Sequence, residues 1–376
     1  MRAAERLKQA AAGCKGYWVT LLCGGAFLGF FLLVRQNRAA MNFLVLHITT
    51  PWKRAVSAAV CMLPFSGMEL CIAALVILGV GLLVRCGVKL KAKGPGIIGR
   101  TLLFFCCAGL LIYDGFCLFW GANYYADSFS DRSGLAAAPV SVESLYETTR
   151  YYAVLANLYC GQVKRDEAGR FDESLDDIFA GAETAYDNIT ERWAFLESPW
   201  RRPKRVFFSK IMSMTNFTGV FFPFLGESNL NVDSPASLIP STIAHELAHQ
   251  KNVAAEQEAN FVAVAASVSA DNPVYRYSGA LLAYIHLGNA LYQADRELWA
   301  EVYGGLDPLV RGDLDENNAY WAAYEGKAAE AAEAIYTGFL QSYGQTMGMK
   351  SYGACVDLLV NDYIGGYEGY EGDGRL

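Results

Sequence analysis

Three apolar stretches in the first third of the chain constrain its fold more than any other feature. Residues 17–34 form an uncharged run of 18 residues, and comparable runs follow within 67–85 and 100–120. A helix needs roughly 20 mostly apolar residues to cross a bilayer. We therefore expect residues 1–120 to form a membrane region with three transmembrane helices, at 17–35, 67–85 and 100–120.

The first stretch could instead be part of a cleaved signal peptide, but it is long for one and lacks a clear cleavage site. Because further apolar runs follow, we favour a retained helix. Basic residues mark the N-terminus and the loop over 85–100, which the positive-inside rule places in the cytoplasm. We therefore expect a multi-pass cell-membrane protein whose domain after residue 121 is extracytoplasmic. The basic residues Arg38, Lys53 and Arg54 of the first loop argue against this orientation.

The rest of the chain is more polar, and we expect one folded domain over residues 121–364. The glycine-rich residues 365–376 are expected to form a flexible tail. The formal net charge is −7, and no basic stripe is interleaved with aromatic residues, so nucleic-acid binding is not indicated. Two of the cysteines, Cys160 and Cys355, lie in this polar part. They could form a disulfide, or remain as two buried thiols.

A histidine motif lies near the middle of the polar region, where the chain reads His245-Glu246-x-x-His249. Four residues advance a helix by about 400°, so the two imidazoles lie on one face and one turn apart. This is the spacing with which a helix offers two ligands to zinc. Glu246 can then accept a proton from a water that the metal activates. The alternative is an amphipathic helix that carries two surface histidines and a glutamate.

A zinc site of this kind needs a third protein ligand. The segment Glu256-x-x-Ala-Asn260 resembles the segment that supplies this ligand in several Glu-zincin families, and Glu258 is the rival candidate. On an unbroken helix Glu256 would lie about 10 Å beyond His249, which is too far for a shared ion. A turn must therefore intervene. Asn252 is the expected position, because asparagine tolerates the left-handed conformation that ends helices.

Helical periodicity dominates the polar region, including residues 142–159, 171–196 and 275–303. The expected fold class is mainly α, with three transmembrane helices followed by a mostly helical, zincin-like domain that contains a small β-sheet. Pro240 followed by Ser241 or Thr242 is expected to start the zinc-binding helix.

Short β-branched and aromatic runs over residues 206–209 and 217–222 predict two strands, and residues 226–232 predict a third. The third strand is placed either as an edge to which an extended peptide adds, or as an ordinary hairpin strand. The basic cluster at 201–205 is interpreted as a solvated linker, with binding to anionic lipid as the alternative.

Six segments of the chain match a known family together: Trp120–Tyr125, Pro223–Asn231, His245–Gln250, Glu256–Phe261, Tyr275–Gly279 and Ser351–Gly353. With these segments the chain resembles a bacterial membrane-anchored family known as domain of unknown function 3810. The resemblance covers nearly the whole chain, including its layout of apolar spans followed by a helical domain. It implies a metallopeptidase fold of the Glu-zincin type, and it supplies no substrate.

The expected mechanism is peptide hydrolysis with a zinc ion (Zn2+) held by His245, His249 and Glu256, and with Glu246 as general base. The substrate would be a peptide or protein, which could itself be associated with the lipid bilayer. The oxyanion needs a further donor. We expect Tyr277 and Tyr352 to act there, with Tyr275 and His286 as alternatives. The competing hypothesis is a catalytically silent zinc-binding or sensor module anchored in the membrane.

Overall fold

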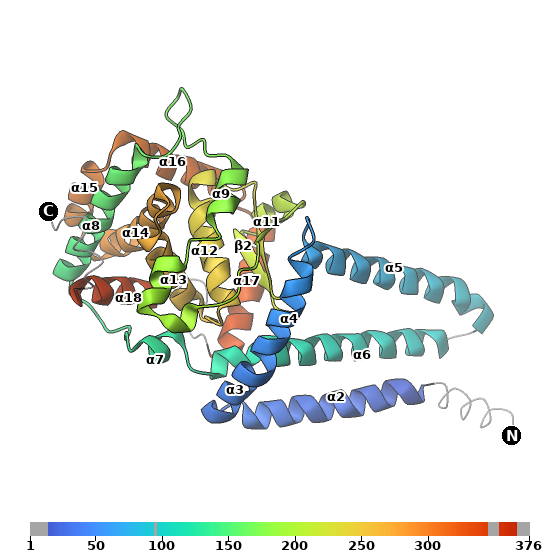
Figure 1. Ribbon diagram of the computed structural model, residues 1–376. Coiled ribbons are helices and arrows are strands. Elements are labelled where there is room, and N and C mark those ends of the chain that lie inside the picture. Colours follow the sequence, from blue (N-terminus) through green and yellow to red (C-terminus); the bar gives the residue numbers. More distant parts are fainter. Residues whose placement is uncertain (1–13, 94–95, 345–352, 367–376) are drawn as a thin grey trace, which may run out of the picture. The chain divides into compact units, whose positions relative to one another are not determined.

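The computed structural model describes residues 14–93, 96–344 and 353–366, and it is mainly helical with one small sheet (Figure 1). The chain divides into two compact units. Unit 1 contains residues up to Lys53, residues 67–126 and residues 223–225, and unit 2 contains residues 54–66, 127–222 and those from 226 onward. The chain thus passes between the units several times, whereas the predicted division came once, at residue 120. Residues 367–376 of the predicted tail lie outside the described residues.

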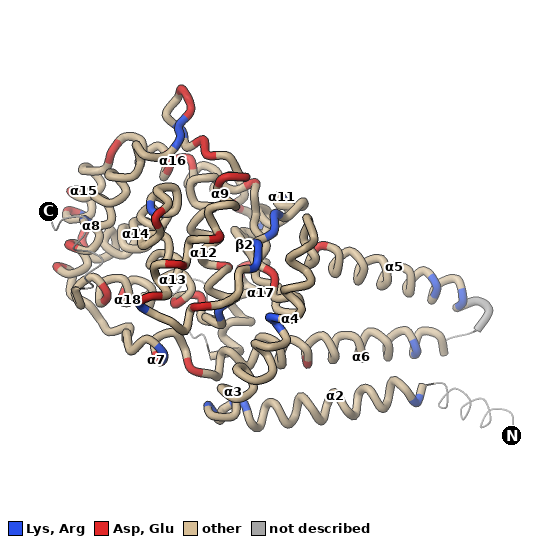
Figure 2. The backbone as a smooth tube through the Cα atoms, viewed as in Figure 1, with Lys and Arg blue, Asp and Glu red and all other residues tan. Residues whose placement is uncertain are grey.

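Unit 1 consists mainly of three long helices, α2 (Lys15–Val34), α5 (Gly67–Lys93) and α6 (Gly96–Phe119). By length and composition each could cross a membrane, over Lys15–Val34, Gly67–Leu90 and Gly96–Phe119. Figure 2 shows that their charged residues lie toward the helix ends. In α2 only Gly24 and Phe31 are buried, and most of its other apolar side chains are exposed or only partly buried. The prediction of three apolar N-terminal helices is confirmed.

Shorter helices connect these three. The helices α3 (Arg38–Leu44), η1 (Val45–Thr49) and α4 (Thr50–Val60) link α2 to α5, and η2 (Gly121–Tyr125) follows α6. Two of the long helices, α2 and α6, approach closely at Gly24, where an added Cβ would lie 2.8 Å from Asp114 Oδ2. Glycine is therefore the residue that permits this contact, as in many helix pairs of membrane proteins.

Unit 2 is built around α14 (Pro273–Ala294), which packs along α8 (Val142–Cys160) and α13 (Glu256–Ser269). Its start is normal for a helix, since Asn272 accepts a hydrogen bond from the backbone N–H of Val274 and proline follows. The helix α12 (Ile239–Gln250) packs against both α13 and α14. The other helices of unit 2 are α7 (Phe129–Ser133), α9 (Leu175–Gly181), α10 (Asp187–Arg192), η3 (Ala194–Leu196), α11 (Ser209–Met214), η4 (Ala236–Leu238), α15 (Arg296–Gly304), α16 (Pro308–Ala322), α17 (Lys327–Ser342) and α18 (Gly353–Ile364).

The sheet has three strands, β1 (Lys204–Arg205), β2 (Gly219–Phe222) and β3 (Glu227–Leu230), in the order β1-β3-β2. The central strand β3 pairs with β1 in parallel and with β2 in antiparallel orientation, and all its residues are buried. The strand predicted within 226–232 is therefore central, and its proposed role as a peptide-binding edge was wrong. The strand predicted at 206–209 was also wrong, because the chain there leaves β1 and enters α11.

Two long helices predicted from periodicity are interrupted in the structure. The stretch 171–196 contains α9, α10 and η3, and α9 ends where the backbone of Gly181 meets Asn272 and Tyr275. The stretch 275–303 is divided into α14 and α15 at Asp295, whose carboxylate accepts hydrogen bonds from the first backbone N–H groups of α15. Short polar side chains of this kind compete with the helical backbone, so periodicity alone does not detect the break.

Cys160 and Cys355 are both buried and free. Burial raises the pKa of each thiol above its ordinary value. Of the two alternatives for this pair, the structure shows the two buried thiols rather than the disulfide.

Candidate metal centre

The helix α12 carries both histidines of the motif and is fixed against the sheet. It starts at Ile239, with Pro240 in its first turn, and the hydroxyls of Ser241 and Thr242 donate to the carbonyl of Leu238. The start therefore lies slightly earlier than the predicted cap at Ser241 or Thr242. Proline is well suited to a first helical turn, where its missing N–H costs no hydrogen bond.

Polar contacts hold α12 to the central strand. The Ser228 hydroxyl donates to the backbone carbonyl of Glu246 at 2.9 Å, and Gln250 Nε2 donates to Ser228 Oγ at 2.8 Å. The rings of His245 and His249 then lie on one face, with centroids 4.7 Å apart. The motif therefore forms the helical pair of imidazoles that its spacing predicts.

The turn after α12 has the predicted left-handed residue. Asn252 has φ +67°, its N–H donates to the carbonyl of His249, and the N–H of Val253 donates to that of Ala248. These two bonds form a Schellman motif, which terminates a helix and reverses the chain. The prediction of a break at Asn252 is confirmed, and it explains how the chain returns to the histidines within a few residues.

The same turn orients one of the imidazoles. The backbone carbonyl of Val253 lies 2.7 Å from His249 Nδ1. A carbonyl can only accept a hydrogen bond, so Nδ1 carries the proton, and Nε2 is the nitrogen directed at Glu256. Carbonyls commonly hold metal-binding histidines in this way. The element that ends α12 therefore also fixes the ring that could bind a metal.

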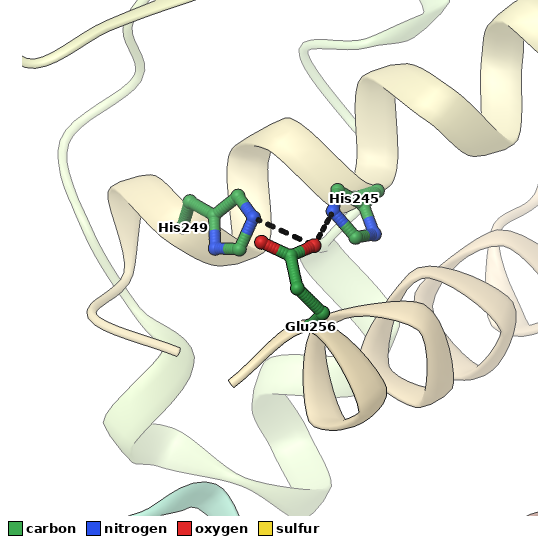
Figure 3. A group of neighbouring side chains, drawn as sticks. All are labelled: His245, His249 and Glu256. Atoms are coloured by element: carbon green, nitrogen blue, oxygen red, sulfur yellow. Dashed lines mark ion pairs between the residues drawn. The ribbon is translucent and has the colours of Figure 1, made fainter. Parts of the chain in front are cut away.

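Glu256, the first residue of α13, completes the cluster (Figure 3). Its Oε2 atom lies 3.2 Å from His245 Nε2 and 3.7 Å from His249 Nε2. One ligand atom from each of the three residues lies within 4.8 Å of the other two. Glu258 points elsewhere, because its carboxylate accepts the backbone N–H groups of Phe129 and Ser130. The structure thus brings together the predicted ligands and separates the rival from them.

The three side chains influence one another electrostatically. Burial opposes a charge on His249, but the Glu256 carboxylate outweighs it and raises the pKa of His249 to about 9. Burial likewise opposes a charge on Glu256, but His249 and His245 hold its pKa well below the ordinary value. A divalent cation at this position would take the place of the imidazolium proton and would meet an ionised carboxylate.

Glu246 lies beside this cluster with an unsatisfied oxygen. Its side chain is 3% exposed, and its Oε2 atom makes no hydrogen bond with the described part of the chain. Burial raises the pKa of Glu246 to about 7, although the charges of His245 and His249 oppose the increase. A carboxyl group whose pKa lies near neutrality is well matched to proton transfer.

The edge strand β2 passes close to the same residues. A Cβ added at Gly219 would lie 2.5 Å from Glu246 Oε1, so only glycine leaves room for the carboxylate. Further along the strand, the ring of Phe221 lies 6.4 Å from that of His249. Neither residue was foreseen as part of the site, because nothing in the sequence indicates which strand crosses α12.

Tyr336 of α17 is a site residue that sequence reasoning missed. Its hydroxyl donates to Glu256 Oε1 at 2.6 Å, which leaves Oε2 directed at the histidines. Its ring packs edge-on against Phe217, just before β2. The chain has 22 tyrosines, and no local pattern distinguishes this one.

The tyrosines expected at the site have other partners. The Tyr277 hydroxyl donates to Asp313, which also binds Arg165 at 2.9 Å, and this buried network contains no residue of the metal cluster. The Tyr275 hydroxyl donates to the carbonyl of Ile178. Both rings are fully buried in the core of unit 2. Their bulk and burial therefore serve packing, and Tyr352 lies outside the described residues.

His286, the remaining alternative, lies in α14 near the cluster. Burial lowers the pKa of His286 to about 4, and the charge of His245 acts in the same direction. His286 is therefore neutral at physiological pH.

Comparison with known proteins gives one match. Residues 47–360 fit the model of the family described as a protein of unknown function (DUF3810). Searches of the curated proteins and of the solved structures each found no match. The family match covers most of the chain, including parts of both units and every residue of the candidate metal centre. The chain therefore belongs to the DUF3810 family.

Proposed function

We propose that the protein is a membrane-anchored, zinc-dependent metallopeptidase of the Glu-zincin type. The observation that carries the proposal is Glu246, a buried carboxylate beside three convergent metal ligands, with one oxygen that makes no hydrogen bond to any residue that the structure describes. A purely structural metal site needs no such group. Buried polar atoms are normally satisfied, so an exception at a candidate metal centre indicates a role in chemistry.

The ligand set fits zinc. Two imidazole nitrogens and one carboxylate oxygen are typical of catalytic zinc sites, and their atoms lie within 4.8 Å of one another. Zinc held by His245, His249 and Glu256 would lower the pKa of a water toward 7 and polarise a substrate carbonyl.

Glu246 would then transfer the proton in both steps of the reaction. Glu246 would accept a proton at Oε2 from the water that attacks the peptide carbonyl carbon. As the C–N bond breaks, Glu246 would deliver that proton to the departing amine nitrogen. The pKa of about 7 is suited to both transfers.

The sheet supports a peptide as substrate. The strand β2 has one edge paired with β3, and no other strand in the described part of the chain pairs with its second edge. Its residues Gly219 and Phe221 lie next to Glu246 and His249. An extended peptide that added to this edge would pass alongside the metal centre. We propose this role for β2 in place of the strand at 227–230.

The test compares wild type with Glu246→Gln, both as full-length protein. We expect both to retain zinc, measured by elemental mass spectrometry, because Glu246 is not a ligand. We expect only wild type to cleave a peptide library, with products identified by mass spectrometry. Glu183→Gln, a change at an exposed glutamate, is the matched control and should behave as wild type.

Unchanged cleavage by Glu246→Gln would reject the general-base role. Zinc uptake without cleavage by wild type would instead favour the silent or sensor module. A chain that binds no zinc would reject both functions.

A further inference from the structure

The short helix α11 buries its polar face and exposes its apolar face, the opposite of the usual arrangement in a folded domain. Its buried residues are Ser209 and Ser213. The Ser209 hydroxyl donates to the carbonyl of Val206, and Ser213 Oγ lies 2.9 Å from the donating Nδ2 of Asn231. The inward face is thus held by hydrogen bonds, so apolar packing does not explain the position of this helix.

The apolar side chains of this region point outward. Phe207 is 84% exposed, Ile211 58% and Met214 52%, and Phe208 is exposed as well. Isolated exposed apolar residues are common, but a group of four around a six-residue helix is not. We call these four residues the outer face of α11.

A second group of exposed apolar residues belongs to the same unit. Met62 and Phe65 are exposed in the loop after α4. This loop is fastened to the sheet, since Lys204 Nζ donates to the carbonyls of Cys61 and Leu63. At its end, the Ser66 hydroxyl donates to Asn229 Oδ1 at 2.7 Å. The loop and α11 are therefore both attached to the small sheet of unit 2.

The segment that follows the loop in the sequence indicates the surroundings of these exposed apolar residues. Ser66 is followed directly by Gly67, the first residue of the apolar span Gly67–Leu90. With that helix in a bilayer, the loop over 62–66 must lie at the membrane boundary. Aromatic and apolar residues at this depth are favourable, because their bodies leave water while the chain remains at the headgroups.

We propose that the outer face of α11 and the loop residues Met62 and Phe65 insert into the headgroup region of the bilayer that α5 enters. The partner of this surface is lipid, and the contact is mainly apolar. It would hold the domain against the membrane at a point beyond its covalent tether.

The charged residues near α11 are consistent with contact between this surface and lipid headgroups. Residues 198–226 contain five basic residues and no Asp or Glu. Three of the five have partners within unit 2: Arg201 donates to Ser57, Lys204 to backbone carbonyls and Arg205 to Asp176. Arg202 and Lys210 remain exposed. The basic cluster therefore has a structural role in part, and its exposed members suit anionic headgroups.

The test uses full-length protein in lipid nanodiscs and the photoreactive residue p-benzoylphenylalanine. The photoreactive residue replaces Phe207 or Ile211. In a matched control it replaces Leu158 of α8, which is apolar and 48% exposed. Nanodiscs of phosphatidylcholine alone, and with added phosphatidylglycerol, are irradiated. Because all three sites are exposed, the substitutions should leave the fold unchanged.

The lipid adducts are identified by the intact mass of the protein. We expect their yield at positions 207 and 211 to be several-fold higher than at position 158 in both kinds of nanodisc. A further increase with phosphatidylglycerol would support the contribution of Arg202 and Lys210. Yields at 207 and 211 no higher than at 158 would overturn the proposal. An adduct with the mass of two protein chains would also overturn it, by assigning the surface to self-association.

Discussion

Gly219 determines how closely β2 can approach the Glu246 carboxylate. In Gly219→Ala the new methyl group would lie 2.5 Å from Glu246 Oε1, so the carboxylate must move. A displacement of about 1 Å in a catalytic group can reduce a rate about 100-fold. We expect a loss of this order in kcat, measured by peptide cleavage, while zinc content stays at the wild-type value.

The matched control is Gly312→Ala, at a helical glycine with open space around it. It should leave both activity and zinc content unchanged. Full activity in Gly219→Ala would show that the Glu246 position is not restricted by β2.

Tyr336 holds one oxygen of Glu256 and so orients the other toward the histidines. Removing that hydroxyl in Tyr336→Phe should lower zinc affinity by roughly 10-fold or more, as is common for groups that position metal ligands. Competition with a chelating dye measures the affinity. Tyr324→Phe provides the comparison, because its hydroxyl also binds a carboxylate, that of Asp233, which is not one of the three candidate ligands. If the two variants bind zinc equally, Tyr336 does not position Glu256.

The residues at the site differ in how far sequence could identify them. His245, Glu246 and His249 follow from spacing, since a helix necessarily places residues i and i+4 on one face. Tyr336 is contributed by a helix 80 residues after Glu256, and such contacts depend on the tertiary fold. Tyr277 was expected at the site because tyrosine can donate to an oxyanion, but its hydroxyl is bonded to Asp313.

At the level of elements, the turn between α12 and α13 is the part on which the cluster depends most. Asn252 has φ +67°, a conformation that glycine adopts freely and that costs a β-branched residue about 1–2 kcal/mol. Asn252→Val should therefore lower the free energy of unfolding by about that amount. It should also weaken zinc binding, because the Val253 carbonyl that orients His249 would shift. Asn252→Gly should remain close to wild type in both.

Thermal unfolding with and without added zinc measures both effects, since a ligand that binds only the folded state raises the melting temperature. Equal melting temperatures for the Val and Gly variants would contradict the role assigned to this turn.

Elements with local signals were predicted better than those set by distant partners. The break at Asn252 has a residue that favours it, and the apolar helices are recognisable from composition alone. The order of the strands could not be read from the sequence, because β1 and β2 both pair with β3 across intervening segments. The stretch 226–232 was predicted as an edge from its polarity, yet residues 227–230 form the central strand and are buried. The side chains of Ser228 and Asn229 are satisfied there by Ser66, Gln250 and the backbone of Glu246.

On the scale of the whole molecule, the contact between Ser66 and Asn229 restricts the topology. The two residues are joined by a hydrogen bond, and the apolar helices α5 and α6 lie between them in the sequence. With both helices in the membrane, the chain crosses it twice between Ser66 and Asn229. The loop over 54–66 and the domain that follows residue 127 therefore share one side of the membrane, whichever side that is.

The metal centre should lie close to that membrane surface. Gly219, which contacts Glu246, is only five positions after Met214 of the outer face of α11. An extended chain of five residues spans at most about 18 Å, so Glu246 would act within roughly 20 Å of the headgroups. Substrates presented at the bilayer surface are therefore favoured over those in bulk solution. This expectation rests on both the proposed peptidase function and the proposed lipid contact.

The measurement compares one peptide in free form with the same peptide anchored to lipid through flexible linkers of increasing length. Full-length protein and peptide share a nanodisc, where tethering raises the effective concentration to about the millimolar range. We expect the anchored peptide to be cleaved faster, with an optimum at short linkers, since the rate falls once the linker exceeds the span. Glu246→Gln should cleave none of the peptides. A variant with Phe207→Ser and Ile211→Ser should keep the activity toward free peptide but lose the preference for short linkers. An optimum at long linkers in wild type would place the metal centre far from the bilayer and would contradict the lipid contact, while leaving the peptidase function intact.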